Sequence, residues 1–567
     1  MATDDLRAHT RSAQRPEVRI LFASWLALAA LALAVAARDL SAPGLYYDEV
    51  IQAVPASEFL AAGDGQPLQM PGASNTRFLG RWLPVFTQPY MGALKSQLLI
   101  PAFAAFGASD ASLRLTTLAW TLLSVWFAML LAHQLLGLGA ALITGALLAV
   151  DPSLLFVGRH DWGSFALAHL CRCAGLYLFA TAWSRRSQVR GFAAGLCLGL
   201  GVYNKIDFAV PLAAAGLALA LVAPRDIAAA LRTQIRRLLP VAAGFALGAA
   251  PMLRELVTTL RVTQGALATA SGPDVWREKL GSLRCMLDGS YFDRLMRAGG
   301  SFERMFDVSS AASGPFLVLY ALAIVFLAGW LARRARQGVW EPASAFVLAT
   351  ALLASLGILA TPRAIRIHHV LGAYPFPQLV VAAAIVKLAG SARFGARRAA
   401  AALVAVLAFG GSGLTSLRTF ETIERTHGKG RWSDAISGLA LELAAEPGAV
   451  AVSLDWGFQA RLRFLDRRLE LREPIWRLVH KSPEEGPWSF QGDDRVRYLL
   501  WDRDFAVFPV GPAFLDCVRD IDSNRITIRR HFDREGDPAF VSVRIAGPHQ
   551  IVYRGARTAH PFEVILQ

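Results

Sequence analysis

The sequence has few cysteines and few charged residues for its length. Five cysteines in 567 residues are too few for a disulfide-stabilised scaffold, and no Cys/His spacing is typical of a zinc site. No internal repeat is evident, which removes one ordinary sign of a secondary transporter built from repeated halves. Only 18% of the residues are charged and 54% are hydrophobic. This composition excludes a single water-soluble domain and indicates a polytopic membrane protein.

The charges that are present are mostly positive, with a net charge of +15. Much of the excess lies in short loops between apolar stretches and does not gather on one basic face. We therefore expect no binding of nucleic acid.

Apolar stretches long enough to cross a bilayer recur along most of the chain. A helix needs about 20 residues to span about 30 Å of hydrocarbon. We predict an α-helical polytopic membrane protein with about eleven transmembrane helices. The predicted spans are 20–38, 112–135, 138–157, 163–183, 191–204, 208–223, 239–258, 315–332, 342–361, 369–389 and 399–417.

Arginines predict how these spans are oriented, because short loops rich in Lys and Arg stay in the cytoplasm. Arginines precede span one and follow spans four, six, eight and ten. The N-terminus is therefore predicted to be cytoplasmic. The predicted parts are a cytoplasmic tail 1–19, a transmembrane domain 20–418 with outer loops 39–111 and 259–314, and an outer domain 419–567.

The first span has an alternative interpretation as a signal peptide. Ala34-Val35-Ala36 resembles a cleavage site. The apolar core is longer than the usual 7 to 15 residues, which favours an uncleaved anchor.

The C-terminal part changes character and is predicted to be a small soluble α/β domain. A helix-like stretch at 432–445 is followed by strand-like runs at 449–454, 497–501 and 540–545. Cys517 in this domain and Cys285 in the 259–314 loop both face the outer side. A disulfide between them is one alternative, which the sequence leaves open.

The long first loop is predicted to contain helices that lie in the headgroup layer. Residues 49–60 favour a short interfacial helix. Residues 82–106 contain Pro84, Pro89 and Pro101, which break the pattern of a clean span.

Polar residues gather near the predicted outer ends of the spans and form the candidate site. Transfer of a sugar from a polyprenyl phosphate needs a carboxylate that takes the acceptor proton and cations that hold the phosphate. Asp48 in Gly44-Leu-Tyr-Tyr-Asp-Glu-Val50 is the preferred base. A single displacement by an acceptor that this base activates would invert the anomeric centre. The remaining candidates are Glu49 as a second catalytic carboxylate, Lys95, Arg159, Lys205 and Arg363 for the donor phosphate, and Tyr47, His160, Asp161, His368 and His369 for substrate.

Each of these residues also has a structural alternative. Asp48-Glu49 could be a solvated helix start, and Lys95 an interfacial lysine that reaches toward water. Arg159 and Asp161 could simply pair across a tight turn, and the two histidines could lack a role. Their gathering on one face favours the functional interpretation.

Two charged residues, Asp151 and Arg172, lie inside neighbouring predicted spans. Each is about ten residues from the connecting turn, or about 15 Å along its helix, so the two could meet at equal depth. A structural ion pair is the default prediction, and a proton or substrate path is the minor one.

Four motifs resemble the GT-C class of membrane glycosyltransferases, specifically bacterial relatives of protein O-mannosyltransferases. They are Asp48-Glu49, Tyr90-Met-Gly-Ala-Leu-Lys95, Arg159-His-Asp-Trp-Gly163, and His368-His369 with Tyr374-Pro-Phe-Pro377. The group includes the lipid A aminoarabinose transferase and the rhizobial galacturonosyltransferases, and the resemblance covers about residues 18–420.

The resemblance implies an inverting transfer, without metal or cofactor, at the periplasmic face of the inner membrane. The implied donor is a polyprenyl-phosphate-linked sugar, and the implied acceptor is a lipid, a glycan or a protein, with membrane lipids around the chain. Asp48 matches the catalytic aspartate, Glu49 its acidic neighbour, and Lys95 a lysine that contacts the lipid phosphate. Ser96-Gln97 stands where the aminoarabinose transferase has two prolines, and Val50-Ile51-Gln52 lacks its basic residue.

Two other classes of protein are kept as alternatives. A transporter or lipid flippase would also carry polar residues near its spans, but it should place them near the bilayer midplane. A membrane-tethered binding protein that works through its C-terminal domain would leave the many spans without a purpose.

Overall fold

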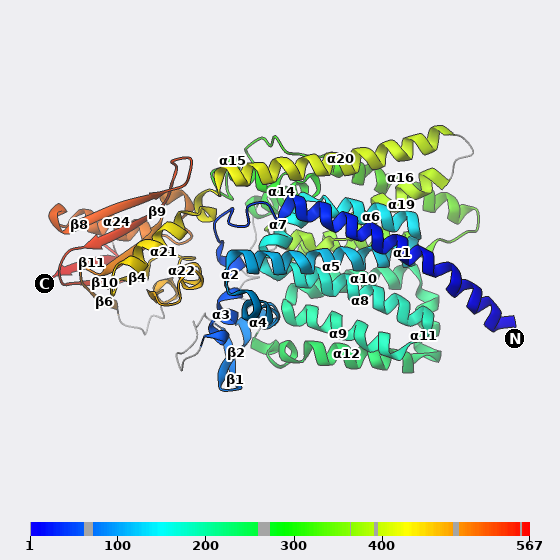
Figure 1. Ribbon diagram of the computed structural model, residues 1–567, viewed down its shortest axis with the longest axis horizontal. Coiled ribbons are helices and arrows are strands. Elements are labelled where there is room, and N and C mark those ends of the chain that lie inside the picture. Colours follow the sequence, from blue (N-terminus) through cyan, green and yellow to red (C-terminus); the bar gives the residue numbers. More distant parts are fainter. Residues whose placement is uncertain are drawn as a thin grey trace.

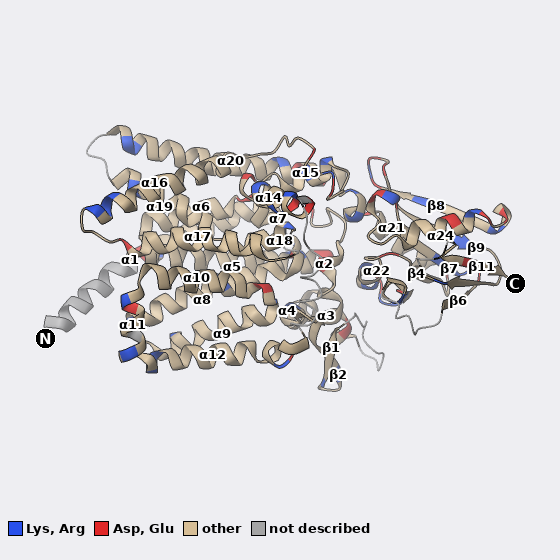
Figure 2. Ribbon diagram, turned by 180° about the vertical axis from the view of Figure 1, so that it is seen from behind, with Lys and Arg blue, Asp and Glu red and all other residues tan. Residues whose placement is uncertain are grey.

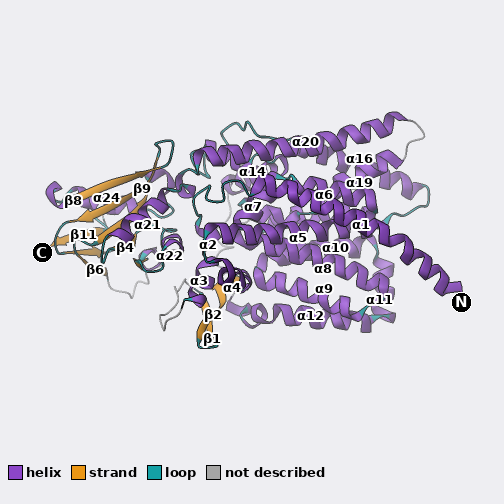
Figure 3. Cartoon of the chain, in the orientation of Figure 1, coloured by secondary structure: helices purple, strands orange, loops and turns teal. Residues whose placement is uncertain are grey.

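The structure, a computed structural model, describes residues 2–61, 72–258, 273–362, 365–390, 395–479, 487–555, 558 and 560–567. A bundle of long helices forms one part of the molecule, and a domain with strands continues from one end of it (Figures 1 and 3). The N-terminus lies at the opposite end of the bundle from the C-terminal domain.

Thirteen long and medium helices build the bundle in the part of the chain that the structure describes. They are α1 (Ala2–Ala36), α5 (Asp110–Leu136), α6 (Leu138–Ala149), α7 (Pro152–His160), α8 (Phe165–Arg185), α9 (Gln188–Asn204), α10 (Ala209–Val222), α11 (Pro224–Thr233), α12 (Ile235–Arg254), α16 (Phe316–Arg336), α17 (Pro342–Ala360), α19 (Phe376–Gly390) and α20 (Gly395–Thr426).

Within the described residues, six helices are long and apolar enough to cross a membrane, or nine if each of three bent helix pairs is one span. The protein is therefore a multi-span membrane protein, as predicted. The predicted spans 191–204 and 239–258 fall in α9 and α12, which are not among these nine but pack within the bundle. The number eleven stays a prediction.

Glycines allow α9 and α12 to pack with their backbones in close contact. A Cβ on Gly195 would lie 1.9 Å from the carbonyl oxygen of Val241, and one on Gly199 would lie 2.3 Å from that of Phe245. Small residues at a helix interface give close packing in a membrane, where the hydrophobic effect does not drive helices together.

Basic side chains mark the end of the bundle near the N-terminus, around α11 and the end of α16 (Figure 2). Arg333, Arg334 and Arg336 close α16 at this end. This distribution is the one expected of a cytoplasmic face. The orientation of the chain in the membrane stays a prediction.

Short elements cover the other end of the bundle. They are α2 (Tyr47–Val50), α3 (Ala53–Leu60), β1 (Ser74–Phe78), β2 (Arg81–Gln88), β3 (Met91–Gly92), α4 (Leu94–Phe106), α14 (Pro273–Asp288), α15 (Tyr291–Arg297) and α18 (Ile367–Val370), with 3₁₀ turns η1 (Trp162–Ser164), η2 (Ile206–Phe208) and η3 (Leu371–Ala373). The predicted interfacial helix at 49–60 is largely α3, preceded by α2.

The prediction of helices throughout 82–106 is wrong for its first part. β1, β2 and β3 form an antiparallel sheet in that order, and only residues 94–106 are helical. Leu79 and Gly80 take positive φ values of 51° and 75°, which is the backbone of a two-residue hairpin turn. This turn, followed by aromatic and β-branched residues in β2, favours strands.

The C-terminal part is the predicted α/β domain. Its five-stranded sheet has the order β5-β4-β7-β9-β8, in which β4 is parallel to β5 and β7, and a smaller sheet has the order β11-β10-β6. The elements are η4 (Gly430–Trp432), α21 (Ala435–Ala445), β4 (Val450–Ser453), α22 (Gln459–Leu465), β5 (Glu470–Arg472), α23 (Ile475–Val479), β6 (Trp488–Gly492), β7 (Val496–Trp501), η5 (Arg503–Phe505), α24 (Val510–Arg519), η6 (Ser523–Arg525), β8 (Ile526–Phe532), β9 (Pro538–Ile545), β10 (His549–Tyr553) and β11 (Phe562–Leu566). Cys285 and Cys517 are both free thiols.

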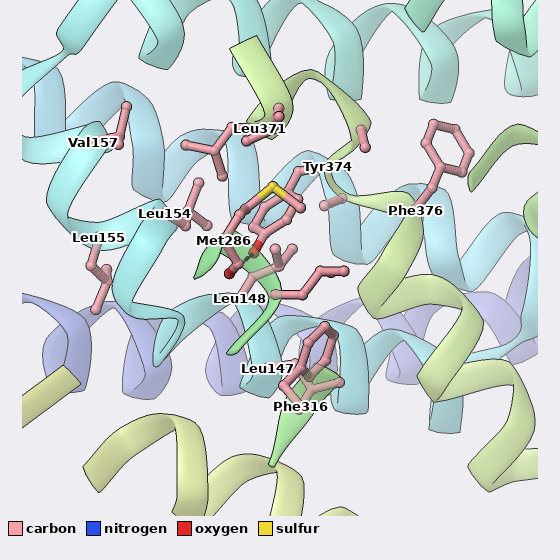
Figure 4. Packing of buried hydrophobic residues seen from close by; sticks show 14 of the residues in the cluster. Leu147, Leu148, Leu154, Leu155, Val157, Met286, Phe316, Leu371, Tyr374 and Phe376 are labelled. Carbon is pink, nitrogen blue, oxygen red and sulfur yellow. Dashed lines mark hydrogen bonds between the residues drawn. The ribbon is translucent and has the colours of Figure 1, made fainter. Parts of the chain in front are cut away.

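The deep charges Asp151 and Arg172 do not form the predicted ion pair. The Tyr374 hydroxyl donates to Asp151 at 2.8 Å, and Arg172 Nε donates to the Tyr374 carbonyl at 2.7 Å. Figure 4 shows Tyr374 among the packed side chains of Leu148, Leu154 and Met286. Tyr374 therefore separates the two charges and gives each of them a polar partner within the core.

Candidate active site

Asp48 lies on the short helix α2, at the end of the bundle that faces the C-terminal domain. The indole Nε1 of Trp162 donates a hydrogen bond to Asp48 Oδ2 at 2.5 Å, and the residue stays partly exposed. Burial raises the pKa of Asp48, while the Trp162 hydrogen bond and the charges of Lys205, Arg431 and Lys95 oppose that rise. A carboxylate that is accessible and near cations can act as a base.

Glu49, the neighbour of Asp48, is bound in a buried ion pair. Arg114 Nε lies 2.6 Å from Glu49 Oε1, and Arg114 Nη2 lies 2.9 Å from Oε2. The same guanidinium donates to the carbonyl of Leu40 at 2.7 Å. Glu49 is 1% exposed, and its ion pair with Arg114 fastens the first loop to α5. Its predicted catalytic role stays a prediction. Sequence reasoning missed Arg114, although an arginine within an apolar span is a signal that it has a partner.

Lys95 and Asp161 form a second buried ion pair under the loop. Lys95 Nζ lies 3.2 Å from Asp161 Oδ2 and donates to the carbonyl of Glu49 at 3.1 Å. Both side chains are 0% exposed. The structure thus places Lys95 beneath the Asp48 loop with Asp161 as its carboxylate partner. Its predicted role at the donor phosphate stays a prediction.

The turn that carries Trp162 has an unusual backbone. Asp161, Gly163 and Ser164 all have positive φ values, of 45°, 69° and 57°. The other carboxylate oxygen of Asp161 accepts from the Ala166 N–H at 2.6 Å, and Asn204 Nδ2 donates to the Ser164 carbonyl at 2.9 Å. These hydrogen bonds hold a backbone conformation with positive φ that most residues disfavour. The turn points the Trp162 indole at Asp48.

Arg159 and His160 lie against backbone carbonyl groups. The Arg159 guanidinium donates to the carbonyls of Ala36 and Arg38, each at 2.9 Å, and to that of Ala42. His160 Nδ1 lies 3.0 Å from the Phe156 carbonyl. Arg159 and His160 are each 1% exposed, and Arg159 does not pair with Asp161. Both side chains therefore hold the chain after α1 and the end of α7. Their predicted roles in binding the donor phosphate and substrate stay predictions.

Lys205, His368 and His369 meet at a cavity between helices of the bundle. The cavity is lined by Gly163, Phe165, Ala168, Arg172, Lys205, Asp207, Phe208, Val210, Pro211, Ile358, Thr361, His368, His369 and Gly372. Asp207 Oδ2 lies 3.0 Å from Lys205 Nζ and 3.1 Å from His369 Nδ1. Arg172, which was not a candidate, also lines this cavity.

Trp162 connects the cavity to Asp48. Its ring centroid lies 4.9 Å from that of His368, which lines the cavity, while its Nε1 binds Asp48. The buried Nδ1 of His368 has no hydrogen-bond partner within the described residues. One indole therefore lies next to both the Asp48 carboxylate and a cavity whose charged lining residues are Lys205, Arg172 and Asp207.

The C-terminal domain packs directly on the loop that carries Asp48. Tyr46 stacks on Trp432 with centroids 4.0 Å apart, and the predicted substrate residue Tyr47 lies 4.3 Å from Trp456 by centroids. Tyr47 is 1% exposed, so it belongs to this interface. Arg363, the remaining predicted phosphate ligand, lies outside the described residues.

The fold is that of the GT-C class of membrane glycosyltransferases. Residues 93–254 match the family model of dolichyl-phosphate-mannose-protein mannosyltransferases. The chain is similar to the apo crystal structure of ArnT from Cupriavidus metallidurans, with 14% identity, a TM-score of 0.50, and coverage of 94% of this chain and 98% of that chain. The fold class predicted from the sequence motifs is confirmed.

Two further solved structures are similar to the chain. ArnT from Cupriavidus metallidurans bound to undecaprenyl phosphate has 13% identity, a TM-score of 0.47, and coverage of 93% of this chain and 97% of that chain. The Archaeoglobus fulgidus oligosaccharyltransferase tethered to an acceptor peptide has 13% identity, a TM-score of 0.47, and coverage of 80% and 64%. No curated protein sequence matches the chain significantly.

Proposed function

We propose that this chain transfers a hexosyl or pentosyl unit from a polyprenyl-phosphate donor to a lipid, glycan or protein acceptor. The reaction takes place at the periplasmic face of the inner membrane, with the N-terminus in the cytoplasm and the C-terminal domain in the periplasm. The observation that carries the proposal is the partly exposed Asp48, which lies beside a cation-lined cavity at one end of a GT-C bundle.

The donor phosphate would lie in the cavity lined by Lys205, His369 and Arg172. The description of the matched family names a dolichyl-phosphate sugar, which is a polyprenyl-phosphate donor. Cations stabilise the phosphate as it becomes more negative when the bond to the sugar breaks. The cavity lies among apolar helices, so the polyprenyl chain can stay in hydrocarbon.

Asp48 acts as the general base. It takes the proton of the acceptor hydroxyl or amine as that atom bonds to the anomeric carbon and the polyprenyl phosphate leaves from the opposite side. One displacement of this kind inverts the anomeric configuration. Removal of a general base lowers a rate by about 10²- to 10⁴-fold.

The test is a mass spectrum of lipids and envelope glycans from cells that lack the protein, complemented with the wild type or with Asp48→Asn at equal membrane abundance. We expect the wild type to restore a missing sugar and Asp48→Asn not to restore it. Asp226→Asn is the matched control, because Asp226 is an exposed carboxylate on α11, at the opposite end of the bundle.

Full restoration by Asp48→Asn would remove Asp48 as the base and favour a transporter or lipid flippase. The mass difference between the two strains gives the class of sugar and shows which molecule accepts it. Nuclear magnetic resonance of that product reports whether the anomeric centre has inverted.

A further inference from the structure

A second cationic cluster lies near Asp48, outside the cavity proposed to hold the donor phosphate. Arg431, on η4, is partly exposed, and its guanidinium carbon lies 5.2 Å from the centroid of the Phe302 ring. Among the described residues its guanidinium has no carboxylate or hydrogen-bond partner, and its buried Nε is one of the unpartnered polar atoms. A buried guanidinium nitrogen without a partner is costly, and a bound anion would supply the missing acceptor.

Arg366 approaches the same aromatic ring. Its guanidinium carbon lies 4.1 Å from the Phe302 centroid, and Nη1 lies 3.4 Å from Glu278 Oε2. Both members of that ion pair are partly exposed, at 21% and 24%. Phe302 is 2% exposed and thus gives two arginines a fixed surface on which to stack.

The cluster lies next to the proposed base. The Phe302 ring packs against Trp162 with centroids 5.7 Å apart, and Trp162 donates to Asp48. Trp432, the residue after Arg431, stacks on Tyr46, two residues before Asp48. Arg431 is also close enough that its charge opposes the rise in the pKa of Asp48 that burial causes.

The donor cavity does not include these residues. Its lining holds His368, Lys205 and Arg172, but not Phe302, Arg366 or Arg431. The Trp162 ring lies 4.9 Å from that of His368 and 5.7 Å from that of Phe302, by centroids. Two cationic groups therefore border the base, and the proposed donor phosphate accounts for only one of them.

The backbone at Arg431 is held by the C-terminal domain. Arg461 Nη1 donates to the Arg431 carbonyl at 2.8 Å and to the Leu45 carbonyl at 3.2 Å. One buried side chain thus fixes both the segment that presents Arg431 and the loop that presents Asp48. The distance between base and cation is set by the fold.

Resting on the proposed function, we infer that Arg431 and Arg366 bind an anionic group of the acceptor beside the atom that receives the sugar. A guanidinium fork matches both phosphate and carboxylate oxygens, so the shared chemistry of the ligand is an oxyanion. The preferred acceptor is then a phosphorylated or carboxylated lipid or glycan, in preference to a neutral one.

The test measures binding to the purified full-length protein by calorimetry. The probes are glycerol 3-phosphate, methyl glucuronide and the neutral methyl glucoside, and the variants are Arg431→Gln, Arg431→Lys and Arg530→Gln. Arg530 is the matched control because it is an exposed arginine on the edge strand β8. We expect Arg431→Gln to weaken the binding of an anionic probe by at least about tenfold, since a hydrogen bond to a charged group contributes about 1.5–3 kcal/mol.

Arg431→Lys should retain part of the affinity, and Arg530→Gln all of it. The anionic probe that binds the wild type more tightly identifies the oxyanion as phosphate or carboxylate. The inference is overturned if neither anionic probe binds the wild type, if methyl glucoside binds equally well, or if Arg431→Gln leaves the affinity unchanged. A loss of polyprenyl-phosphate binding in Arg431→Gln, with acceptor probes unaffected, would also overturn it by assigning the arginine to the donor.

Asp48→Asn separates this inference from the proposed function. If Asp48→Asn binds the anionic probe as tightly as the wild type but transfers no sugar, the assignment of the base and the anion site are both supported. If it transfers sugar normally while Arg431→Gln loses the probe, the assignment of the base fails and the anion site remains.

Discussion

The pKa of Asp48 is set by its burial and by contacts with a few single residues. Burial disfavours its charged form, while one indole N–H and three neighbouring cations favour it. The net result is a raised pKa for Asp48. A base with a raised pKa holds a proton more strongly once it has taken one.

This balance gives a pH dependence whose sign is fixed. Asp48 must be ionised to accept a proton, so transfer should fall as the pH decreases through its pKa. Trp162→Phe removes a hydrogen bond that lowers the pKa of Asp48, so the acidic limb of the profile should move to higher pH.

Transfer rates of wild type and Trp162→Phe between about pH 4 and 8, measured at saturating donor, would show this shift. Trp183→Phe is the control, since Trp183 is an exposed indole at the other end of α8. An acidic limb that stays in place, or moves to lower pH, contradicts the assignment of Asp48.

A second prediction at the residue scale concerns the pair of Glu49 and Arg114. Arg114→Met leaves the Glu49 carboxylate buried without a partner, which costs about 3–5 kcal/mol. The double variant Glu49→Gln with Arg114→Met should recover part of this lost stability, because it also removes the buried negative charge of Glu49.

Thermal unfolding in detergent compares the two variants, with Arg225→Met on α11 as an exposed control. A single variant as stable as the wild type would show that the pair does not hold the loop. If Glu49 were a catalytic acid, Glu49→Gln alone would lose activity without losing stability.

At the scale of elements, the turn between α7 and α8 decides where the Trp162 indole points. Gly163 has a φ of 69°, and a Cβ there would lie 2.7 Å from Cδ2 of His368. Gly163→Ala therefore meets both backbone strain of about 1 kcal/mol and a clash with a side chain of the donor cavity.

We expect Gly163→Ala to lower transfer by about tenfold or more, because Trp162 and His368 cannot both keep their places. Gly216→Ala is the control: Gly216 lies on α10, and a Cβ there would meet nothing within 4 Å. Kinetics of the two purified variants settle the point, and equal rates would mean that the turn has no influence on the site.

At the scale of the whole molecule, the C-terminal domain is part of the site's architecture. Arg461 is 1% exposed and bonds to Leu45, Arg431 and Gly457 through their carbonyls. Gly44 packs so closely that a Cβ would lie 2.3 Å from the Ser433 carbonyl oxygen. The domain therefore positions the loop that carries Asp48.

Arg461→Met should reduce kcat by about tenfold and leave the KM for donor nearly unchanged, because the donor cavity lies in the bundle. Arg461→Lys should recover part of kcat, and Arg530→Gln should not alter it. Limited proteolysis near residues 427–434 would report loosening of the domain. An unchanged kcat with normal folding would show that the domain does not position the loop.

The sequence by itself determined the fold class of the protein and the α/β nature of its C-terminal domain. These features depend on local composition and on short motifs, which a linear pattern records. The prolines in 82–106 exclude a clean span but do not distinguish interfacial helices from strands, and the Leu79-Gly80 turn directs residues 82–92 into a sheet.

Only the tertiary structure decided which charges meet. Arg114 pairs with Glu49 across 65 positions and Lys95 with Asp161 across 66, while Arg159 turns to backbone carbonyls and Tyr374 stands between Asp151 and Arg172. Trp162 and Arg431 both pack against the ring of Phe302. They meet there because the C-terminal domain packs on the first loop. A buried charge binds whichever partner the packing brings near it, and that proximity is a property of the folded chain.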